Sequence, residues 1–335
     1  MITRPSTQED DTPMNTFEQH QSPAITASGI TRSYGAIDAV VGVDLEVTRG
    51  ETVALLGPNG AGKTTVVEIL EGLRRRDSGV VDVLGHDPQH ADASWRARIG
   101  AVLQLGTETD EFTVAELLTS HAAYYPNPRP VPEIVEALDL TGLEDRRVRR
   151  LSGGQRRRLD IALGIVGNPE LLFLDEPTTG LDVEARHSIW QLIQALADGG
   201  TTIVLTTHYL DEVEHLADRT VVLVDGATVW TGKTSALRNT NAPTTIAFGL
   251  RQPLTIADLP GRLGVLATEV GPGRVTIDSG DVNRIVADLL QWAASRDGAD
   301  PVTNLQIGQP TLEDAYLALL DTTHGTTHGK REHRQ

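Results

Sequence analysis

Cysteine is absent from all 335 residues of the chain, so disulfide bonds and thiolate metal sites are excluded. Aromatic residues are scarce at 4%, although hydrophobic residues reach 39%. The interior is therefore expected to pack mainly leucine, valine, isoleucine and alanine. At roughly 100–200 residues per domain, a chain of this length predicts about two domains.

Long apolar runs are also missing. A membrane-spanning helix needs about 20 predominantly apolar residues, and the best candidates, at 36–47 and 202–206, are short and interrupted by polar or charged residues. Residues 1–22 have no apolar segment like that of a secretory signal and are rich in Thr, Gln, Asp, Glu and Pro. We expect a disordered leader over 1–22. If the chain acts at a membrane, we expect another protein to anchor it there.

Positive charge is in deficit, because 29 Lys and Arg stand against 46 Asp and Glu and give a formal net charge of −17. Such a chain repels a phosphate backbone unless it carries a strong local basic patch. We therefore predict no nucleic-acid partner. Basic clusters at 74–76, 146–150 and 156–158 are interpreted as solvated faces, with contact to anionic lipid headgroups as the alternative.

Residues 23–238 are predicted to form one domain. Strand and helix patterns alternate along it, which predicts an α/β core with a largely parallel sheet. Between 88 and 168 the pattern is mostly helical, and Thr113 with Glu116 fits a capping box at one helix start. The strands expected are 24–33, 36–47, 51–56, 171–174 and 202–206, the hairpin is 221–231, and the main helices are 63–70, 113–125, 134–140, 184–197 and 210–217.

A polar stretch at 239–245 is predicted to be a linker. Beyond it, short strand and helix patterns indicate a small α+β domain over 245–321, followed by a tail over 322–335 that we expect to be disordered. No second copy of the first domain is found. The strands expected in the second domain are 245–250, 265–270, 274–277 and 302–307, with helices at 282–295 and 312–320.

The phosphate loop, residues 57–64, has the sequence GPNGAGKT and fits the pattern G-x-x-x-x-G-K-[ST]. Its glycines let several backbone N–H groups point at one phosphate, and the following helix directs its positive end to the same place. Lys63 adds a full charge for the β- and γ-phosphates, and Thr64 offers a hydroxyl to Mg²⁺. The alternative is a glycine-rich turn with a chance lysine. Alone, the loop indicates a nucleoside triphosphate.

Residues 171–176 have the sequence LLFLDE, in which an apolar strand ends in two acids. Ligands of open α/β sheets bind at the carboxyl ends of the strands. Asp175 is therefore placed to hold Mg²⁺, and Glu176 to orient or deprotonate an attacking water. A solvated acidic turn is the alternative interpretation.

The LSGGQ segment, residues 151–155, precedes a helix pattern and is a second candidate for anion binding. Ser152 supplies a hydroxyl, and Gly153 and Gly154 expose backbone N–H groups. A plain capped helix start is the alternative. Two anion-binding helix starts in one chain raise the question of whether each binds its own nucleotide.

Six motifs occur in the order and approximate spacing seen in ATPase subunits of the ABC family: GPNGAGKTT, Gln104, LSGGQ, LLFLDEP, the GLD of 180–182 and His208. The resemblance covers about 25–232. It implies a P-loop NTPase core of the ABC type, with a parallel sheet, an antiparallel β subdomain and a helical subdomain over about 90–165. The small C-terminal α+β domain is additional.

The resemblance also implies a head-to-tail homodimer, in which the LSGGQ segment of one subunit closes over ATP held by the phosphate loop of the other. Glu176, His208 and Gln104 are the implied catalytic residues, and Thr64, Gln104 and Asp175 the Mg²⁺ ligands. Tyr34 resembles the aromatic residue that stacks on adenine, with packing in a hairpin as the alternative. The implied ATP-binding residues are Tyr34, Gly57, Pro58, Asn59, Gly60, Ala61, Gly62, Lys63, Thr64, Thr65, Ser152, Gly153, Gly154, Gln155 and Asp182.

The run DRRVRRLSGGQRRRLDIA and the ending QPTLEDAYLALL are similar to those of the daunorubicin-resistance-type (ABC-2) exporter ATPases. This implies an ATPase at the cytoplasmic face of the cell membrane that powers a separate integral-membrane permease for drugs, lipids or similar compounds. A soluble ABC-type ATPase clamp acting on a cytosolic macromolecule is the alternative. The single ATPase copy argues against translation-factor relatives, and the missing cysteines argue against zinc-bearing repair relatives.

Overall fold

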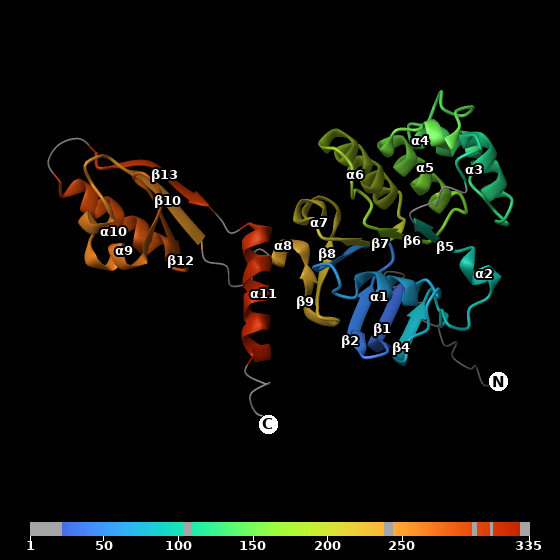
Figure 1. The fold of residues 1–335 in the computed structure, drawn as a ribbon, viewed down its shortest axis with the longest axis horizontal. Coiled ribbons are helices and arrows are strands. Elements are labelled where there is room, and N and C mark those ends of the chain that lie inside the picture. The colour runs from blue at the N-terminus through green and yellow to red at the C-terminus, as the bar shows by residue number, and fades with distance from the viewer. Residues whose placement is uncertain (1–21, 103–108, 238–243, 297–299, 309–310, 329–335) are drawn as a thin grey trace, which may run out of the picture.

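The computed structural model describes residues 22–102, 109–237, 244–296, 300–308 and 311–328. Three sheets organise them (Figure 1). No helix among these residues combines the length and the apolar character that crossing a bilayer requires.

The central sheet has six strands in the order β5-β6-β7-β3-β8-β9. All neighbours are parallel except β8 and β9, which form the predicted hairpin with its turn at Asp225 and Gly226. Strands β3 and β7 are buried along their whole length, as is typical of a parallel sheet with both faces covered. The strands are β3 (Thr52–Leu56), β5 (Ile99–Val102), β6 (Leu171–Asp175), β7 (Thr202–Thr207), β8 (Arg219–Val224) and β9 (Ala227–Lys233).

Alternate residues of each central strand face opposite sides of the sheet. Leu55 and Phe173 pack with α1 and a second, antiparallel sheet, whereas Leu56 and Leu174 pack with helices of the other face. The parallel α/β core predicted from the sequence is confirmed. The helices bordering this sheet include α1 (Lys63–Leu70), α5 (Gly153–Ile165), α6 (Val183–Asp198) and α7 (Leu210–Leu216).

The antiparallel sheet has the order β2-β1-β4, with β1 (Ile25–Tyr34), β2 (Ile37–Val47) and β4 (Ser78–Val83). The first two strands were expected, but β4 was not. Its exposed edge residues, such as Val80 with 72% exposure, leave a weak alternation of buried and exposed positions. Pairing with β1 is what makes 78–83 a strand.

The segment over 88–168 is less helical than predicted. It contains the helices α2 (Ala93–Arg96), α3 (Val114–Ala122) and α4 (Val131–Ala137), but also strand β5. Gly100 in β5 lies against helix α5 so closely that a Cβ there would come within 2.1 Å of the Gly164 carbonyl oxygen. Four residues that include a glycine carry too little pattern to predict a strand. The capping box at Thr113 and Glu116 is confirmed.

The C-terminal sheet is antiparallel throughout, in the order β11-β12-β10-β13, and has its own apolar cluster. Residues 265–270, predicted to be a strand, are divided: Val265 and Leu266 end helix α9, whose N-cap is Pro260. The elements are β10 (Thr244–Leu250), α9 (Gly261–Leu266), β11 (Ala267–Gly271), β12 (Arg274–Ser279), α10 (Val282–Ala294) and β13 (Val302–Gly308).

The last helix, α11 (Leu312–His328), packs on the first domain and not on the C-terminal sheet with which it was grouped over 245–321. It contacts α7 and α8 (Thr234–Leu237; Figure 1), and Leu312 belongs to an apolar cluster of the first domain. The helix also extends seven residues into 322–335, where a disordered tail was expected. Because α9 and α10 already cover one face of the C-terminal sheet, the apolar stripe of α11 is buried elsewhere.

The docking of α11 can be tested with Ala315→Asp, since Ala315 is 0% exposed. Because burying an unpaired carboxylate is costly, the substituted helix is expected to separate from α7 and α8. The free energy of unfolding then falls by about 2–3 kcal/mol, which is what burial of one leucine, such as Leu312, contributes. Leu317→Asp is the matched control, because Leu317 is 50% exposed on the same helix. Urea denaturation of both variants checks this, and equal stabilities would contradict the docking.

Candidate functional site

The phosphate loop joins strand β3 to helix α1, as predicted. Gly62 is the N-cap of α1 with φ 96°, and a Cβ at this position would come within 2.3 Å of the Ala39 carbonyl oxygen. Only glycine fits both constraints. Lys63 is 6% exposed, and its Nζ donates to the carbonyl oxygens of Gly57 at 2.8 Å and Pro58 at 3.1 Å.

The loop and a catalytic candidate share one pocket of about 420 Å³. Burial lowers the pKa of the Lys63 ammonium, while the carboxylates of Glu176 and Asp175 act in the opposite direction. The pocket therefore places a cation, a helix N-terminus and a carboxylate around one volume. Its lining residues are Ala39, Asn59, Gly60, Ala61, Gly62, Lys63, Thr64, Thr65 and Glu176.

Asp175 and Glu176 lie at the carboxyl end of β6, where the sequence predicted the Mg²⁺-binding and catalytic carboxylates. The hydroxyl of Thr206 on the adjacent strand β7 donates to Asp175 Oδ1. The carboxylate of Asp175 and the hydroxyl of Thr64 are hard oxygen donors, the type that Mg²⁺ accepts alongside nucleotide phosphates. The residues present therefore fit a magnesium ion.

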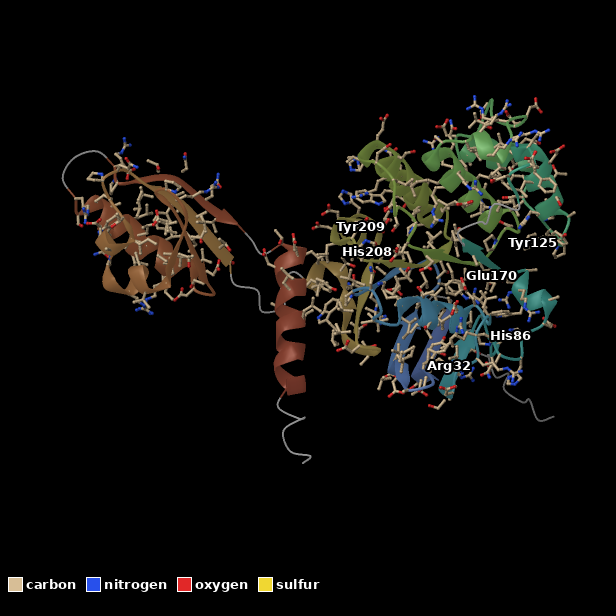
Figure 2. All side chains as sticks on the ribbon, viewed as in Figure 1. Arg32, His86, Tyr125, Glu170, His208 and Tyr209 are labelled. Atoms are coloured by element: carbon tan, nitrogen blue, oxygen red, sulfur yellow. The ribbon has the colours of Figure 1, made fainter. Side chains whose placement is uncertain are left out.

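Glu176 is held by two side chains. Thr179 Oγ1 donates to Glu176 Oε2 at 3.0 Å, and His208 Nδ1 lies 3.2 Å from Glu176 Oε1. The Glu176 side chain keeps 27% exposure, so it remains accessible. Figure 2 shows His208 beside Tyr209, where the chain leaves the sheet edge for α7. Thus two residues from separate strand ends meet.

The LSGGQ segment begins helix α5 with a capping box. Ser152 Oγ accepts from the Gln155 N–H at 3.3 Å, and Gln155 Oε1 accepts from the Ser152 N–H at 3.0 Å. Asp182 caps helix α6 by accepting from the Ala185 N–H at 2.8 Å. Both segments line a second pocket of about 590 Å³ that shares no lining residue with the first: Ser152, Gly154, Gln155, Arg158, Asp182, Glu184, Ala185, His187, Ser188 and Gln191.

Tyr34 does not line either pocket. The guanidinium groups of Arg32 and Arg74 lie 5.0 Å and 5.2 Å from the centre of its ring, within the range of cation–π attraction. Stacking on adenine at Tyr34 stays a prediction. Gln104 lies outside the described residues, so its place at the site also stays a prediction.

Arg157 is a site residue that the sequence reasoning missed, because 156–158 was interpreted as one solvated basic face. Successive helix positions turn by about 100°, and Arg157 points inward with 8% exposure. Its Nε donates to the Pro177 carbonyl oxygen at 2.7 Å and its Nη2 to the Asp175 carbonyl oxygen at 2.9 Å. Helix α5 therefore holds the backbone on both sides of Glu176.

The remaining arginines of the basic clusters largely form ion pairs. Arg156 contacts Asp110 at 2.8 Å, and Arg158 pairs with Asp139. Further pairs join Arg147 and Arg149 to Glu111, Arg74 to Glu68 and Arg76 to Asp87. These contacts give the clusters a structural role within the chain.

Glu71, at the end of α1, is a buried carboxyl beneath the site with 5% exposure. Burial raises the pKa of Glu71 to about 8, and the negative charges of Asp175 and Glu68 add to the shift. The group is therefore neutral in the folded protein at pH 7 but ionised in the unfolded chain.

This difference predicts a pH-dependent stability. Below about pH 4.5 Glu71 is protonated in both states, so it has no effect; between about 4.5 and 8 the folded state binds the extra proton and stability falls as pH rises. Glu71→Gln removes this loss. The free energy of unfolding of Glu71→Gln minus that of the wild type is therefore expected to be about 3–5 kcal/mol larger at pH 8 than at pH 4.5. Denaturant titrations across this range check it, with Glu184→Gln, at an exposed position in the first turn of α6, as the control. An unchanged pH slope in Glu71→Gln would contradict the burial argument.

Comparison with known proteins agrees with this geometry. The family model described as ABC transporter matches residues 40–179. The daunorubicin/doxorubicin resistance ATP-binding protein DrrA of Streptomyces peucetius is 37% identical over 306 residues, covering 88% of this chain and 92% of that protein. The Nod factor export ATP-binding protein I of Rhizobium meliloti is 35% identical over 313 residues, covering 91% of both chains.

Solved structures give the same fold. The ADP conformation of an ATP-binding cassette of an ABC transporter aligns with a TM-score of 0.59 and 26% identity, covering 65% of this chain and 94% of the other. A dimeric post-hydrolysis cassette bound to ADP and Pi aligns with a TM-score of 0.57 and 25% identity, covering 63% and 98%. The matched motifs, the shared fold and the nearly full-length relatives lead to one conclusion: this chain belongs to the ATP-binding subunits of ABC transporters.

Proposed function

We propose that this chain hydrolyses ATP in a head-to-tail homodimer and thereby powers export through a separate integral-membrane permease. One observation carries the proposal: the phosphate loop and the LSGGQ segment line two pockets with no common residue. A two-fold axis brings the phosphate-loop pocket of one subunit against the LSGGQ pocket of the other. Each nucleotide then lies between one half-site from each subunit.

In this site Lys63 and the backbone of 57–65 hold the phosphates, and Ser152, Gly153, Gly154 and Gln155 of the opposite subunit close over the γ-phosphate. Thr64, Asp175 and Gln104 would hold Mg²⁺, which would neutralise charge on the phosphates. Glu176 accepts a proton from the attacking water. Phosphoryl transfer depends mainly on positioning and charge stabilisation, which preformed hydrogen bonds provide.

The contacts of Glu176 suit this role. Thr179 and His208 each engage one carboxylate oxygen, so the side chain is oriented before nucleotide binds. In this proposal His208, whose Nδ1 lies 3.2 Å from Glu176 Oε1, contacts the γ-phosphate and steadies the attacking water. Asp182, within the LSGGQ pocket, is placed to pass information between the two nucleotide sites.

The cargo class follows from the relatives. Their names refer to daunorubicin and doxorubicin resistance and to Nod factor export, and both alignments include the C-terminal domain. We therefore place this subunit at the cytoplasmic face of the cell membrane, with drugs, lipids or similar compounds as cargo. The permease selects the compound.

Glu176→Gln tests the catalytic assignment. An amide cannot accept the proton, so ATP turnover is expected to fall by about 10²–10⁴-fold, while ATP binding is retained and a closed dimer accumulates. Steady-state phosphate release and size-exclusion chromatography with ATP measure the two effects. Glu136→Gln, at an exposed position of α4 that lines neither pocket, is the control. Normal turnover in Glu176→Gln would remove Glu176 from the mechanism.

Purification of tagged Glu176→Gln protein from its native membranes tests the coupling to a permease. With ATP present, a polytopic membrane protein is expected to co-purify, and it should be lost without ATP because the dimer opens. Lys63→Ala, which removes the cation of the phosphate loop, is the control that should not show the ATP dependence. Recovery of soluble partners alone would favour the ATPase-clamp alternative.

A further inference from the structure

Glu212, on the first turns of α7, is a buried carboxyl with 0% exposure. Its Oε1 accepts two hydrogen bonds, from Thr178 Oγ1 at 2.9 Å and from Trp190 Nε1 at 3.2 Å. Burial raises its pKa, and the side chains of Thr207, Thr178 and Trp190 act against that shift. A buried carboxyl is costly unless its partners are specific, so the contact calls for an explanation beyond packing.

Thr178 connects this carboxyl to the catalytic candidate. It is 0% exposed and lies two residues after Glu176. The next residue, Thr179, donates its hydroxyl to Glu176 Oε2 and its backbone N–H to the Glu176 carbonyl oxygen at 3.3 Å. Anchoring Thr178 therefore anchors the hydroxyl that orients the Glu176 carboxylate.

The other end of the connection is His208. Helix α7 begins at Leu210, directly after His208 and Tyr209, and the Val213 N–H donates to the Tyr209 carbonyl oxygen at 3.3 Å. Figure 2 shows His208 and Tyr209 together at this helix start. Since Glu212 lies in the same turns, a displacement of this part of α7 away from Thr178 also moves the backbone that carries His208.

Glu176 needs such support, because its φ of 45° is unfavourable for a residue with a side chain. Arg157 holds the flanking carbonyl oxygens from the side of α5. Glu212 holds Thr178, two residues after Glu176, from the side of α7. A strained catalytic backbone persists only where the surrounding contacts over-determine it.

We infer that Glu212 is a positioning residue, which ties the 176–179 turn to α7 and so sets Glu176 and His208 relative to each other. This inference rests on the proposed ATP hydrolysis. Glu212 itself is fully buried and does not line the phosphate-loop pocket. The contacts predict an effect on turnover, with little effect on ATP affinity, because no residue that lines the phosphate-loop pocket bonds to Glu212.

The test compares Glu212→Ala, Glu212→Gln and Thr178→Val in the full-length protein. Glutamine has the same shape as glutamate and keeps an Oε1 acceptor for Thr178 and Trp190, while its amide nitrogen replaces Oε2. Leu216→Ala is the matched control: it truncates another buried side chain of α7, one that cannot hydrogen-bond to the 176–179 turn. The readouts are kcat and KM for ATP, Kd for an ATP analogue and the midpoint of thermal unfolding.

We expect kcat to fall about 10-fold or more in Glu212→Ala and in Thr178→Val, with Kd within about twofold of the wild type. The double variant should be no slower than the slower single variant, because one connection is lost in both. Glu212→Gln should recover at least half of the wild-type kcat. Leu216→Ala should lower the unfolding midpoint and leave kcat unchanged below it.

A Glu212→Ala protein with the kcat of Leu216→Ala, or a Glu212→Gln protein as slow as Glu212→Ala, would overturn the inference. Failure of the proposed function is distinguishable from both results, because the wild-type protein itself would then release no phosphate from ATP.

Discussion

Parallel pairing of β3 and β6 on either side of β7 is the constraint on which the site depends. The register places Leu56 beside Thr207 and Asp175 beside Thr206, so three strands end at one level of the sheet. The phosphate loop, the 176–179 turn and His208 leave the sheet from that level. A shift of one strand by a residue would invert its side chains and remove one of the three groups from the pocket.

Buried polar side chains hold these strand ends together. Arg157 reaches from α5 to the backbone around Glu176, and Glu212 reaches from α7 to the same turn. Each is satisfied mainly by backbone carbonyls, a hydroxyl or an indole N–H, and not by an exposed ion pair. Directional bonds of this kind specify a geometry, whereas apolar packing alone tolerates small displacements.

The same helices also make contacts beyond the site. Helix α5 begins at the LSGGQ segment, which lines the second pocket, and α7 carries α11 on its outer side. Helix α11 follows the C-terminal sheet in sequence but belongs by packing to the ATPase core. In the chain, the C-terminal sheet therefore lies between two helices that pack on the first domain, α8 before it and α11 after it.

The local sequence determined the features that a few neighbouring residues can specify. These are the phosphate loop before α1, the apolar strand before Asp175, the capping boxes at Thr113 and Ser152, and the hairpin turn at Asp225 and Gly226. Each depends on backbone conformation or side-chain reach within about one turn, so neighbouring residues in the sequence are enough to predict it.

Tertiary structure alone decided the rest. Strand β4 exists because it pairs with β1. Position 100 has no room for a side chain because α5 approaches it closely. Arg157 and Glu212 acquire their partners from segments 18 to 34 residues away in the chain. The docking of α11 depends on which apolar faces remain uncovered after the sheets have formed. Long-range contacts of this kind cannot be predicted from hydrophobic periodicity, because arginine and glutamate most often lie on solvent-exposed helix faces.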